Sequence, residues 1–319
     1  MPLISNSVPL QAINDLITEQ YGVNLFVLRT DKNHADISGN KLFKLKYNLE
    51  EAVRQNKKTL LTFGGAFSNH IAATAAAGKE FNFKTIGIIR GEKYSNLNPT
   101  LKFASDCGMQ LHYVSRTVYQ NKNELYKYVD QLFPEQDIYT IPEGGNNNLG
   151  IEGCKEITKY IGINFDYVCC ACGTGATITG IILSLINNQK AIGFQALKAD
   201  SYIKNEVTTG LDKFLNSTDF LKQQDNWQIN EEYHFGGYAK TKQELTDFIA
   251  QFKNDNNIPL DPIYTGKMMF GIYDLIKKGK IKKGETIVAV HTGGLQGIEG
   301  VNFLKKRNAD NAVDYDKNG

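Results

Sequence analysis

Residues 166–177 read DYVCCACGTGAT, a short apolar run followed directly by a glycine-rich turn. An apolar run of this length, bounded by turn residues, is typical of a buried strand. Gly173 and Gly175 then lead into a segment that we expect to be a helix. Such a turn directs backbone N–H groups and the helix dipole to one point. The stretch therefore predicts a strand, a turn and a helix, and it makes the turn a candidate anion site.

Apolar runs rich in Val, Ile, Thr and Tyr recur along the chain, and segments with helical periodicity separate most of them. The clearest helix is expected to begin at Thr241, where Thr241 and Glu244 have the spacing of a capping box. Alternating strands and helices predict parallel sheets covered by helices on both faces, with ligands beyond the carboxyl ends of the strands. The other expected strands are 59–63, 84–89, 110–114, 137–141, 191–196 and 286–291; the shared helix face is Leu245, Phe248, Ile249 and Phe252.

Length and composition restrict the class of protein. With 319 residues the chain exceeds one hydrophobic core, so we expect about two domains. Its 36 basic and 34 acidic residues are spread evenly, which disfavours a nucleic-acid partner. We find no apolar run long enough for a membrane helix and no signal-peptide pattern, so we expect a cytoplasmic protein with no membrane partner. The polar sequence after Leu304 predicts that the last dozen or so residues fray.

The five cysteines do not indicate a disulfide framework, because their number is odd and Cys169, Cys170 and Cys172 crowd into one apolar run. Cys169 and Cys172 have the separation of half a zinc site, but no second pair occurs at a suitable spacing. We therefore expect buried, inert thiols on a strand and no metal.

Two further runs end in glycine-rich turns, FGGAFSNH at 63–70 and HTGGLQ at 291–296. Taken singly, each turn is more typical of a plain tight turn than of a binding site. The turn at 173–177 lacks the G-x-G-x-x-G spacing of a dinucleotide site, and Asp200 lies too far along the chain to bind a ribose. Phosphate without a dinucleotide fits better, which disfavours a nicotinamide cofactor.

Lys41 and Lys44 stand three residues apart in the stretch SGNKLFKL at 38–45. If a helix begins near Lys41, both side chains can reach one cavity. Periodicity alone leaves open the simpler interpretation that both lysines are solvated.

Five motifs together resemble the family of 1-aminocyclopropane-1-carboxylate (ACC) deaminases and D-cysteine desulfhydrases, pyridoxal-phosphate enzymes with the tryptophan synthase β-like fold. The resemblance covers nearly the whole chain, with the motifs in the same order and spacing. They are SGNK at 38–41, GGAFSNH at 64–70, GTGAT at 173–177, DPIYTGK at 261–267 and HTGG at 291–294.

The resemblance implies an α/β fold with two domains, each an open, mostly parallel sheet flanked by helices. We expect residues 1–41 and 136–319 to form a large domain that binds pyridoxal 5′-phosphate, with a small domain inserted at 42–135. The family further implies that the cofactor lies between the domains and that the chain forms a homodimer.

The resemblance also implies roles for individual residues. Lys41 resembles the Schiff-base lysine and Lys44 the lysine that approaches the cofactor phosphate. Asn69 is similar to the asparagine that contacts the pyridine 3-oxygen. The phosphate cradle is expected at Gly173, Thr174, Gly175, Ala176 and Thr177.

Around the substrate, the resemblance implies binding by Ser68, Asn69, His70 and Tyr264. Lys41 or Ser68 is expected to remove a proton, and Tyr264 or Ser68 to assist the second transfer. Thr292 stands where this fold offers a hydroxyl to the pyridine nitrogen, although Thr265 is the alternative.

Three positions depart from the deaminase pattern, with Thr265 in place of Glu, Thr292 in place of Leu and His70 in place of Gln. A neutral hydroxyl beside the pyridine nitrogen gives a weaker electron sink than a carboxylate. We therefore expect a small amino-acid substrate and D-cysteine desulfhydrase activity, with ACC deaminase as the alternative. A protein that binds the cofactor as a carrier or sensor is the alternative from another class.

Overall fold

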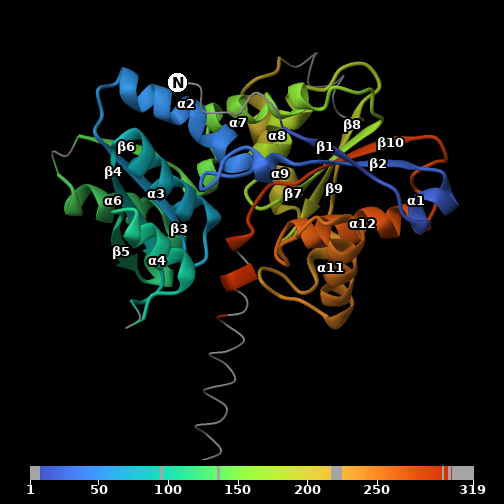
Figure 1. Ribbon diagram of the computed structural model, residues 1–319. Helices are drawn as coiled ribbons and strands as arrows, with labels where there is room; N and C mark the ends of the chain where they lie inside the picture. The colour runs from blue at the N-terminus through green and yellow to red at the C-terminus, as the bar shows by residue number, and fades with distance from the viewer. Residues whose placement is uncertain are drawn as a thin grey trace, which may run out of the picture. The chain divides into compact units, whose positions relative to one another are not determined.

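The computed structural model describes residues 8–93, 96–134, 137–216, 225–296, 298–300 and 303. The described chain forms two sheets with mostly parallel strands, and helices flank both sheets (Figure 1). The predicted α/β fold class is confirmed. The predicted fraying after Leu304 concerns residues that lie outside the described ranges.

The larger sheet has six strands in the order β1-β2-β10-β7-β8-β9. All neighbours pair in parallel except β1 and β2, which are antiparallel. The strands are β1 (Leu10–Ile13), β2 (Asn24–Leu28), β7 (Tyr167–Cys172), β8 (Lys190–Gln195), β9 (Trp227–Asn230) and β10 (Thr286–Val290). The central strands are buried almost throughout, as expected for parallel strands that are covered on both faces.

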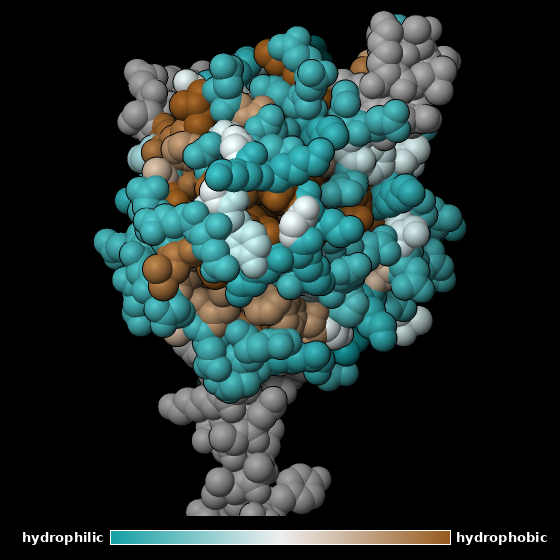
Figure 2. All heavy atoms as spheres, turned by 90° about the vertical axis from the view of Figure 1, so that its right-hand side faces the viewer, coloured by the Kyte–Doolittle hydropathy of each residue, from teal (hydrophilic) through white to brown (hydrophobic). Residues whose placement is uncertain are grey.

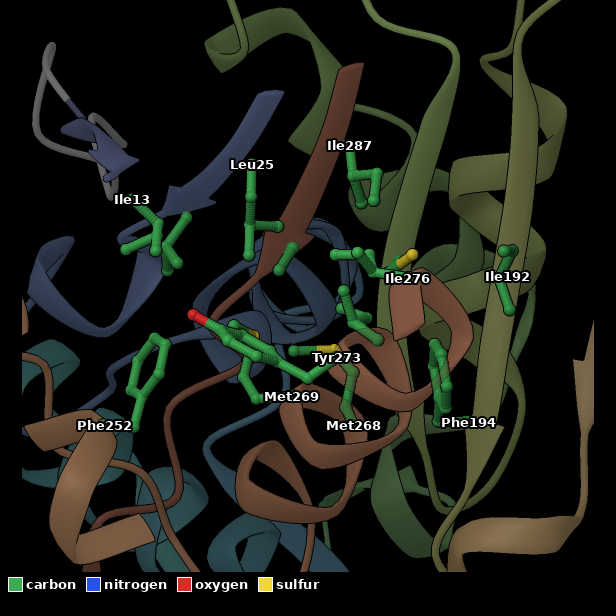
Figure 3. Close-up of a cluster of buried hydrophobic side chains, with 14 of the residues drawn as sticks. Ile13, Leu25, Ile192, Phe194, Phe252, Met268, Met269, Tyr273, Ile276 and Ile287 are labelled. Atoms are coloured by element: carbon green, nitrogen blue, oxygen red, sulfur yellow. The ribbon is translucent and has the colours of Figure 1, made fainter. Parts of the chain in front are cut away.

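Two hydrophobic cores cover the two faces of the six-stranded sheet. On one face Met268, Met269 and Ile276 of α12 (Thr265–Lys277) pack with Leu25 and Ile287 of the strands (Figure 3). The opposite core contains side chains from α8 (Ala176–Leu183). Successive residues of β7 alternate between these cores, so its three cysteines are buried and free. Burial raises the pKa of the Cys169 thiol, which fits the predicted inert thiols.

The smaller sheet has four parallel strands in the order β5-β4-β3-β6. One face is packed by Ile71 and Ala75 of α3, and the other by Leu125 and Val129 of α6. Its elements are β3 (Thr59–Gly65), α3 (Asn69–Phe81), β4 (Lys84–Arg90), α4 (Pro99–Asp106), β5 (Gln110–Val114), α5 (Arg116–Gln120), α6 (Lys122–Leu132) and β6 (Ile138–Ile141).

The described chain divides into two compact units. Of the described residues, those up to 48 and from 145 to 295 form the first unit, which contains the six-stranded sheet. Those from 49 to 144 and from 296 onward belong to the second unit, which contains the four-stranded sheet. The division falls within α2 (Asn40–Arg54). The assignment of a cofactor domain to 1–41 and 136–319, with an inserted domain at 42–135, stays a prediction.

The predicted capping box at Thr241 is wrong. The helix, α11 (Gln243–Asn256), begins after Lys242, whose side chain makes no capping hydrogen bond. Its predicted apolar face does pack into the core. Phe252 belongs to the cluster that includes Met268, whereas Phe248 and Ile249 pack against that cluster, and Leu245 is buried. The remaining described elements are α1 (Leu16–Tyr21), α7 (Asn148–Cys154), α9 (Tyr202–Asp212) and the short 3-10 helices Thr30–Lys32, Glu143–Gly145, Ile157–Tyr160 and Glu232–His234.

Hydrophilic side chains predominate on the face in Figure 2, with smaller apolar areas between them. None of the described helices combines the length and the apolar character that crossing a bilayer requires.

Candidate active site

The loop between β7 and α8 has the features of an anion site. Gly175 precedes α8 with a φ of 87°, a left-handed conformation that favours glycine, and offers no side chain to cap the helix. The first N–H groups of α8 therefore lack a side-chain cap. The Thr174 hydroxyl is buried and has no hydrogen-bond partner within the described residues. Uncapped amides and an orphaned hydroxyl together suit a phosphate.

Asn40 connects this loop to Lys41. Its side-chain Nδ2 donates to the Thr177 hydroxyl at 2.8 Å, and its side-chain Oδ1 accepts from Lys41 Nζ at 2.7 Å. The preceding Gly39 lies so close to Thr292 that an added Cβ would be 2.2 Å from the Thr292 carbonyl oxygen. Gly39 also has a φ of 72°, so glycine is required twice over at this position.

Lys41 and Lys44 lie in the first turns of α2, which is the condition under which both side chains were expected to reach one cavity. Burial, assisted by the charge of Lys44, lowers the pKa of Lys41 to about 7. Lys44 is only 4% exposed, and burial lowers its pKa as well. An amine with a pKa near 7 is largely available in its neutral, nucleophilic form at neutral pH. The simpler interpretation of two solvated lysines is therefore wrong.

Asp261 organises the start of α12 and thereby places Tyr264. Its buried carboxylate accepts from the backbone N–H groups of Ile263, Tyr264 and Thr265 at 2.8 to 2.9 Å. The Tyr264 ring then lies against Gly173, where an added Cβ would be 3.1 Å from Tyr264 Cε1 and 3.2 Å from its hydroxyl oxygen. The predicted tyrosine and the predicted anion loop are therefore neighbours.

The two threonines considered for the pyridine nitrogen differ in their hydrogen bonding. The Thr265 hydroxyl donates to Asp261 Oδ2 at 2.6 Å and accepts from the Asp261 N–H at 2.9 Å, and the residue is fully buried. Thr292 is 6% exposed, and the part of the chain that the structure describes provides no partner for its hydroxyl. Thr292 is therefore the threonine whose hydroxyl is available to a ligand.

The segment that carries Thr292 is fixed from several sides. The Thr30 hydroxyl donates to the His291 carbonyl oxygen at 2.6 Å, and the Asn40 N–H donates to the Thr292 carbonyl oxygen at 3.3 Å. His291 Nε2 lies 2.6 Å from the Pro259 carbonyl oxygen, while its Nδ1 accepts from the Gly293 N–H at 3.3 Å. These contacts hold the His291 ring in place and fix the backbone on both sides of Thr292.

Ser68, Asn69 and His70 belong to the second unit and follow the end of β3. Ser68 caps α3, its hydroxyl oxygen accepting from the Ile71 N–H at 3.3 Å. Asn69 Oδ1 is buried without a hydrogen-bond partner in the described chain, and His70 is buried. The predicted place of these residues at the same site as Lys41 stays a prediction.

No role was predicted from the sequence for Asn40 or Asp261. Asp261 had a local signal, because an aspartate can accept hydrogen bonds from the backbone N–H groups three and four residues later, here those of Tyr264 and Thr265. Asn40 had none, because its partner Thr177 is 137 residues away.

Residues 6–293 match the family model described as pyridoxal-phosphate dependent enzyme. The chain belongs to this family of enzymes, and the predicted cofactor is confirmed.

Within this family the chain is similar to ACC deaminases and D-cysteine desulfhydrases, as the motifs predicted. It is 32% identical to the mitochondrial bifunctional D-cysteine desulfhydrase/1-aminocyclopropane-1-carboxylate deaminase of Arabidopsis thaliana, over 87% of this chain and 74% of that protein. It is 25% identical to the D-cysteine desulfhydrase of Yersinia pestis, over 92% and 93% of the two chains. A crystal structure of an ACC deaminase homologue superposes with a TM-score of 0.78 at 25% identity, covering 92% of this chain and 91% of the other.

The residues of the first unit fit pyridoxal phosphate. Its phosphate needs hydrogen-bond donors, which the Thr174 hydroxyl and the uncapped amides of α8 provide. Its aldehyde needs a neutral amine, which the lowered pKa of Lys41 provides. Both features are costly to a folded protein without a ligand to use them, since an unpaired buried hydroxyl and a desolvated lysine each destabilise the native state.

Proposed function

We propose that this enzyme eliminates the β-substituent of a small D-amino acid, with D-cysteine as the leading substrate. D-cysteine and water are then converted to pyruvate, ammonia and hydrogen sulfide. The observation that carries the proposal is a difference in hydrogen bonding between the two threonines. The Thr265 hydroxyl is bonded to Asp261, whereas the Thr292 hydroxyl has no hydrogen-bond partner among the described residues. A cytoplasmic location and a homodimer stay predictions.

We propose that Lys41 bonds the cofactor covalently and that Lys44, with the loop at 173–177, holds its phosphate. Asn69 is the proposed partner of the pyridine 3-oxygen, and its buried, unpartnered Oδ1 in the described chain supports a polar ligand there. When bound, the cofactor supplies a ring that accepts the electron pair released at the substrate α-carbon.

Lys41 is also the proposed base at the α-carbon. With a pKa of about 7 it is substantially neutral near neutral pH, and it can return a proton once it is charged. The hydrogen bond from Nζ to Asn40 Oδ1 uses an N–H and leaves the nitrogen lone pair available. Asn40 thus orients the amine while the amine stays reactive.

Tyr264 or Ser68 is the proposed donor of the proton that the departing sulfur takes up. The Tyr264 hydroxyl lies beside Gly173 of the anion loop, and the Tyr264 backbone N–H donates to Asp261 Oδ1. The Ser68 hydroxyl oxygen accepts from Ile71 N–H, so its own hydrogen remains free to donate. Ser68 can therefore donate a proton without giving up the hydrogen bond that positions it.

A hydroxyl at the pyridine nitrogen suits β-elimination better than opening of a cyclopropane ring. A carboxylate there favours the protonated ring, which withdraws electrons strongly, whereas a hydroxyl leaves the ring neutral. A thiol is a good leaving group, so its elimination needs less electron withdrawal by the ring than the opening of a cyclopropane does. The chain's Thr292 therefore supports D-cysteine over ACC, although its relatives include proteins named for each activity.

The test is a substrate comparison with the purified, cofactor-loaded enzyme. D-cysteine, L-cysteine and ACC are supplied separately, and pyruvate, sulfide and 2-oxobutyrate are measured. The proposal predicts pyruvate and sulfide in equal amounts from D-cysteine, at a kcat/KM well above that for the other two. Release of 2-oxobutyrate from ACC with no sulfide from D-cysteine would establish the deaminase instead. Lys41→Met should abolish turnover, and the exposed Lys58→Met serves as its control.

A further inference from the structure

Lys267 is a buried cation for which the proposed reaction has no use. Its side chain lies on α12, one turn after Tyr264, and is 1% exposed. Its ammonium donates to three backbone carbonyl oxygens, those of Ala196 at 3.2 Å, His234 at 2.8 Å and Gly237 at 2.7 Å. The three acceptors come from two separate segments. Ala196 directly follows β8, whereas His234 ends the 3-10 helix Glu232–His234 and Gly237 lies just after it.

The three hydrogen bonds require the charged form of the side chain, because a neutral amine has only two N–H donors. Burying an ammonium is costly unless its donors are satisfied, and here all three are. Burial lowers the pKa of Lys267 to about 8, and the charge of Asp261 opposes this effect. The desolvation of this ammonium disfavours the folded state. We take its presence to indicate that the segment whose carbonyl groups it binds needs to be fixed in place.

The turn at 234–239 is that segment, and its backbone is strained. Phe235 and Ala239 have φ values of 53° and 55°, in the left-handed region that residues other than glycine rarely adopt. Gly236 and Gly237 have φ values of 97° and 119°. The turn's own hydrogen bonds run from Gly237 N–H to the His234 carbonyl and from Lys240 N–H to the Gly237 carbonyl. Lys267 binds the same two carbonyl oxygens and so reinforces the turn at both.

The turn presents Tyr238 to Tyr264. The two rings meet edge to face, with centroids 6.3 Å apart and an interplanar angle of 70°. On its other side the Tyr264 ring lies against Gly173 of the anion loop. Lys267 binds the turn, and Tyr238 of the turn contacts Tyr264, which is one of the two proposed proton donors.

We propose that Lys267 is a positioning residue whose ammonium fixes the 234–239 turn, so that Tyr238 holds the Tyr264 ring against Gly173. This role rests on the proposed function of Tyr264. It acts through backbone carbonyl groups, so it requires a cation with several donors and not simply a long side chain.

Amide hydrogen exchange of the cofactor-free protein tests the first half of the proposal. Lys267→Met keeps the length of the side chain and removes the charge, while Lys277→Met, at the exposed end of the same helix, is the matched control. We expect residues 234–240 to exchange about tenfold faster or more in K267M, with the strands of the sheet unchanged and K277M like the wild type. Unchanged exchange in the turn would overturn the proposal. If K267M does not fold, K267Q, which retains two N–H donors, replaces it in the same comparison.

A double-mutant cycle on kcat and KM tests the second half. K267M and Tyr238→Leu are each expected to lower kcat about tenfold, and the double variant should be hardly worse than either single one, because both remove the same support of Tyr264. Additive losses would show that Lys267 acts independently of Tyr238 and would overturn the proposal. K267R, which keeps the cation, should recover most of kcat. The exchange result needs no turnover, so it remains decisive for the turn even if the proposed reaction is wrong.

Discussion

Lys41 Nζ lies 2.7 Å from Asn40 Oδ1, so the amine that we propose to bond the cofactor is oriented by its immediate neighbour in the chain. The same Asn40 side chain donates to Thr177 in the anion loop. One amide therefore fixes the distance between the reactive amine and the phosphate cradle. Its neutrality also matters, because a charge at this position would change the pKa of Lys41.

Asn40→Asp should move the acidic limb of the pH profile to higher pH. A carboxylate beside Lys41 stabilises its ammonium form and raises a pKa that now lies at about 7. Because the neutral amine is the reactive form, activity then requires a pH about one unit higher or more. The measurement is kcat for D-cysteine from pH 5.5 to pH 9.5, because kcat reports groups in the enzyme–substrate complex, where the substrate has released Lys41 from the cofactor. Asn24→Asp, at an exposed position on β2, is the control and should leave the limb in place. If the acidic limb of the pH profile stays in place in N40D, that limb does not reflect the pKa of Lys41.

Much of the fold was predictable because the central strands carry their signal locally. Each of the seven expected strands occurs, with ends that differ by two residues at most. The strands that escaped prediction, β1, β2 and β9, are short and lie toward the edges of the sheet. Their identity depends on distant partners: Asn24 of β2 pairs with Thr286 of β10. Local periodicity cannot encode such a pairing.

The candidate site was likewise predictable only where the signal is local. Lys41, Lys44 and Tyr264 were predicted from motifs, but the choice between Thr265 and Thr292 was not. That choice depends on a carboxylate four residues before Thr265, which occupies its hydroxyl. Hydroxyl groups are equivalent in a sequence and become distinct only when their hydrogen-bond partners are known.

Thr292→Val and Thr265→Val should therefore have different consequences. T292V removes the hydroxyl proposed to face the pyridine nitrogen, so we expect a shifted cofactor absorbance spectrum and a kcat at least about tenfold lower, with unchanged stability of the cofactor-free protein. T265V leaves Asp261 Oδ2 short of a donor, so it should reduce the free energy of unfolding by about 1–3 kcal/mol with little effect on the spectrum. Spectra, kcat and urea unfolding of both variants decide the matter. A spectral shift in T265V alone would reverse the assignment.

The stability of the cofactor-free protein should rise with pH because of Lys41. Its pKa falls from 10.5 to about 7 on folding, so between these values the unfolded chain binds more protons than the folded one. The destabilisation is full below about pH 7 and is progressively lost as the pH rises toward 10.5. Lys44 and Lys267 contribute in the same direction. Lys41→Met should therefore stabilise the cofactor-free protein more at pH 7 than at pH 9, as measured by urea unfolding. An equal gain at both values would contradict the lowered pKa.

Thr174→Val tests whether the orphaned hydroxyl of the anion loop exists for the phosphate. The hydroxyl is buried, and the described residues offer it no hydrogen-bond partner, so its removal costs the cofactor-free protein nothing and should leave the free energy of unfolding unchanged or raised. If the hydroxyl donates to the charged phosphate, its loss should weaken cofactor binding by about tenfold to a hundredfold.

Thr74→Val is the matched control for this prediction. The Thr74 hydroxyl is likewise buried and lacks a partner in the described chain, but it lies within α3 and not in the anion loop. The same substitution should leave the cofactor dissociation constant unchanged at Thr74 and raise it at Thr174, as measured by titration of the cofactor-free protein with pyridoxal phosphate. Equal affinities in T174V and the wild type would show that the phosphate does not use this hydroxyl. The cradle would then depend on the uncapped N–H groups of α8 and on Lys44.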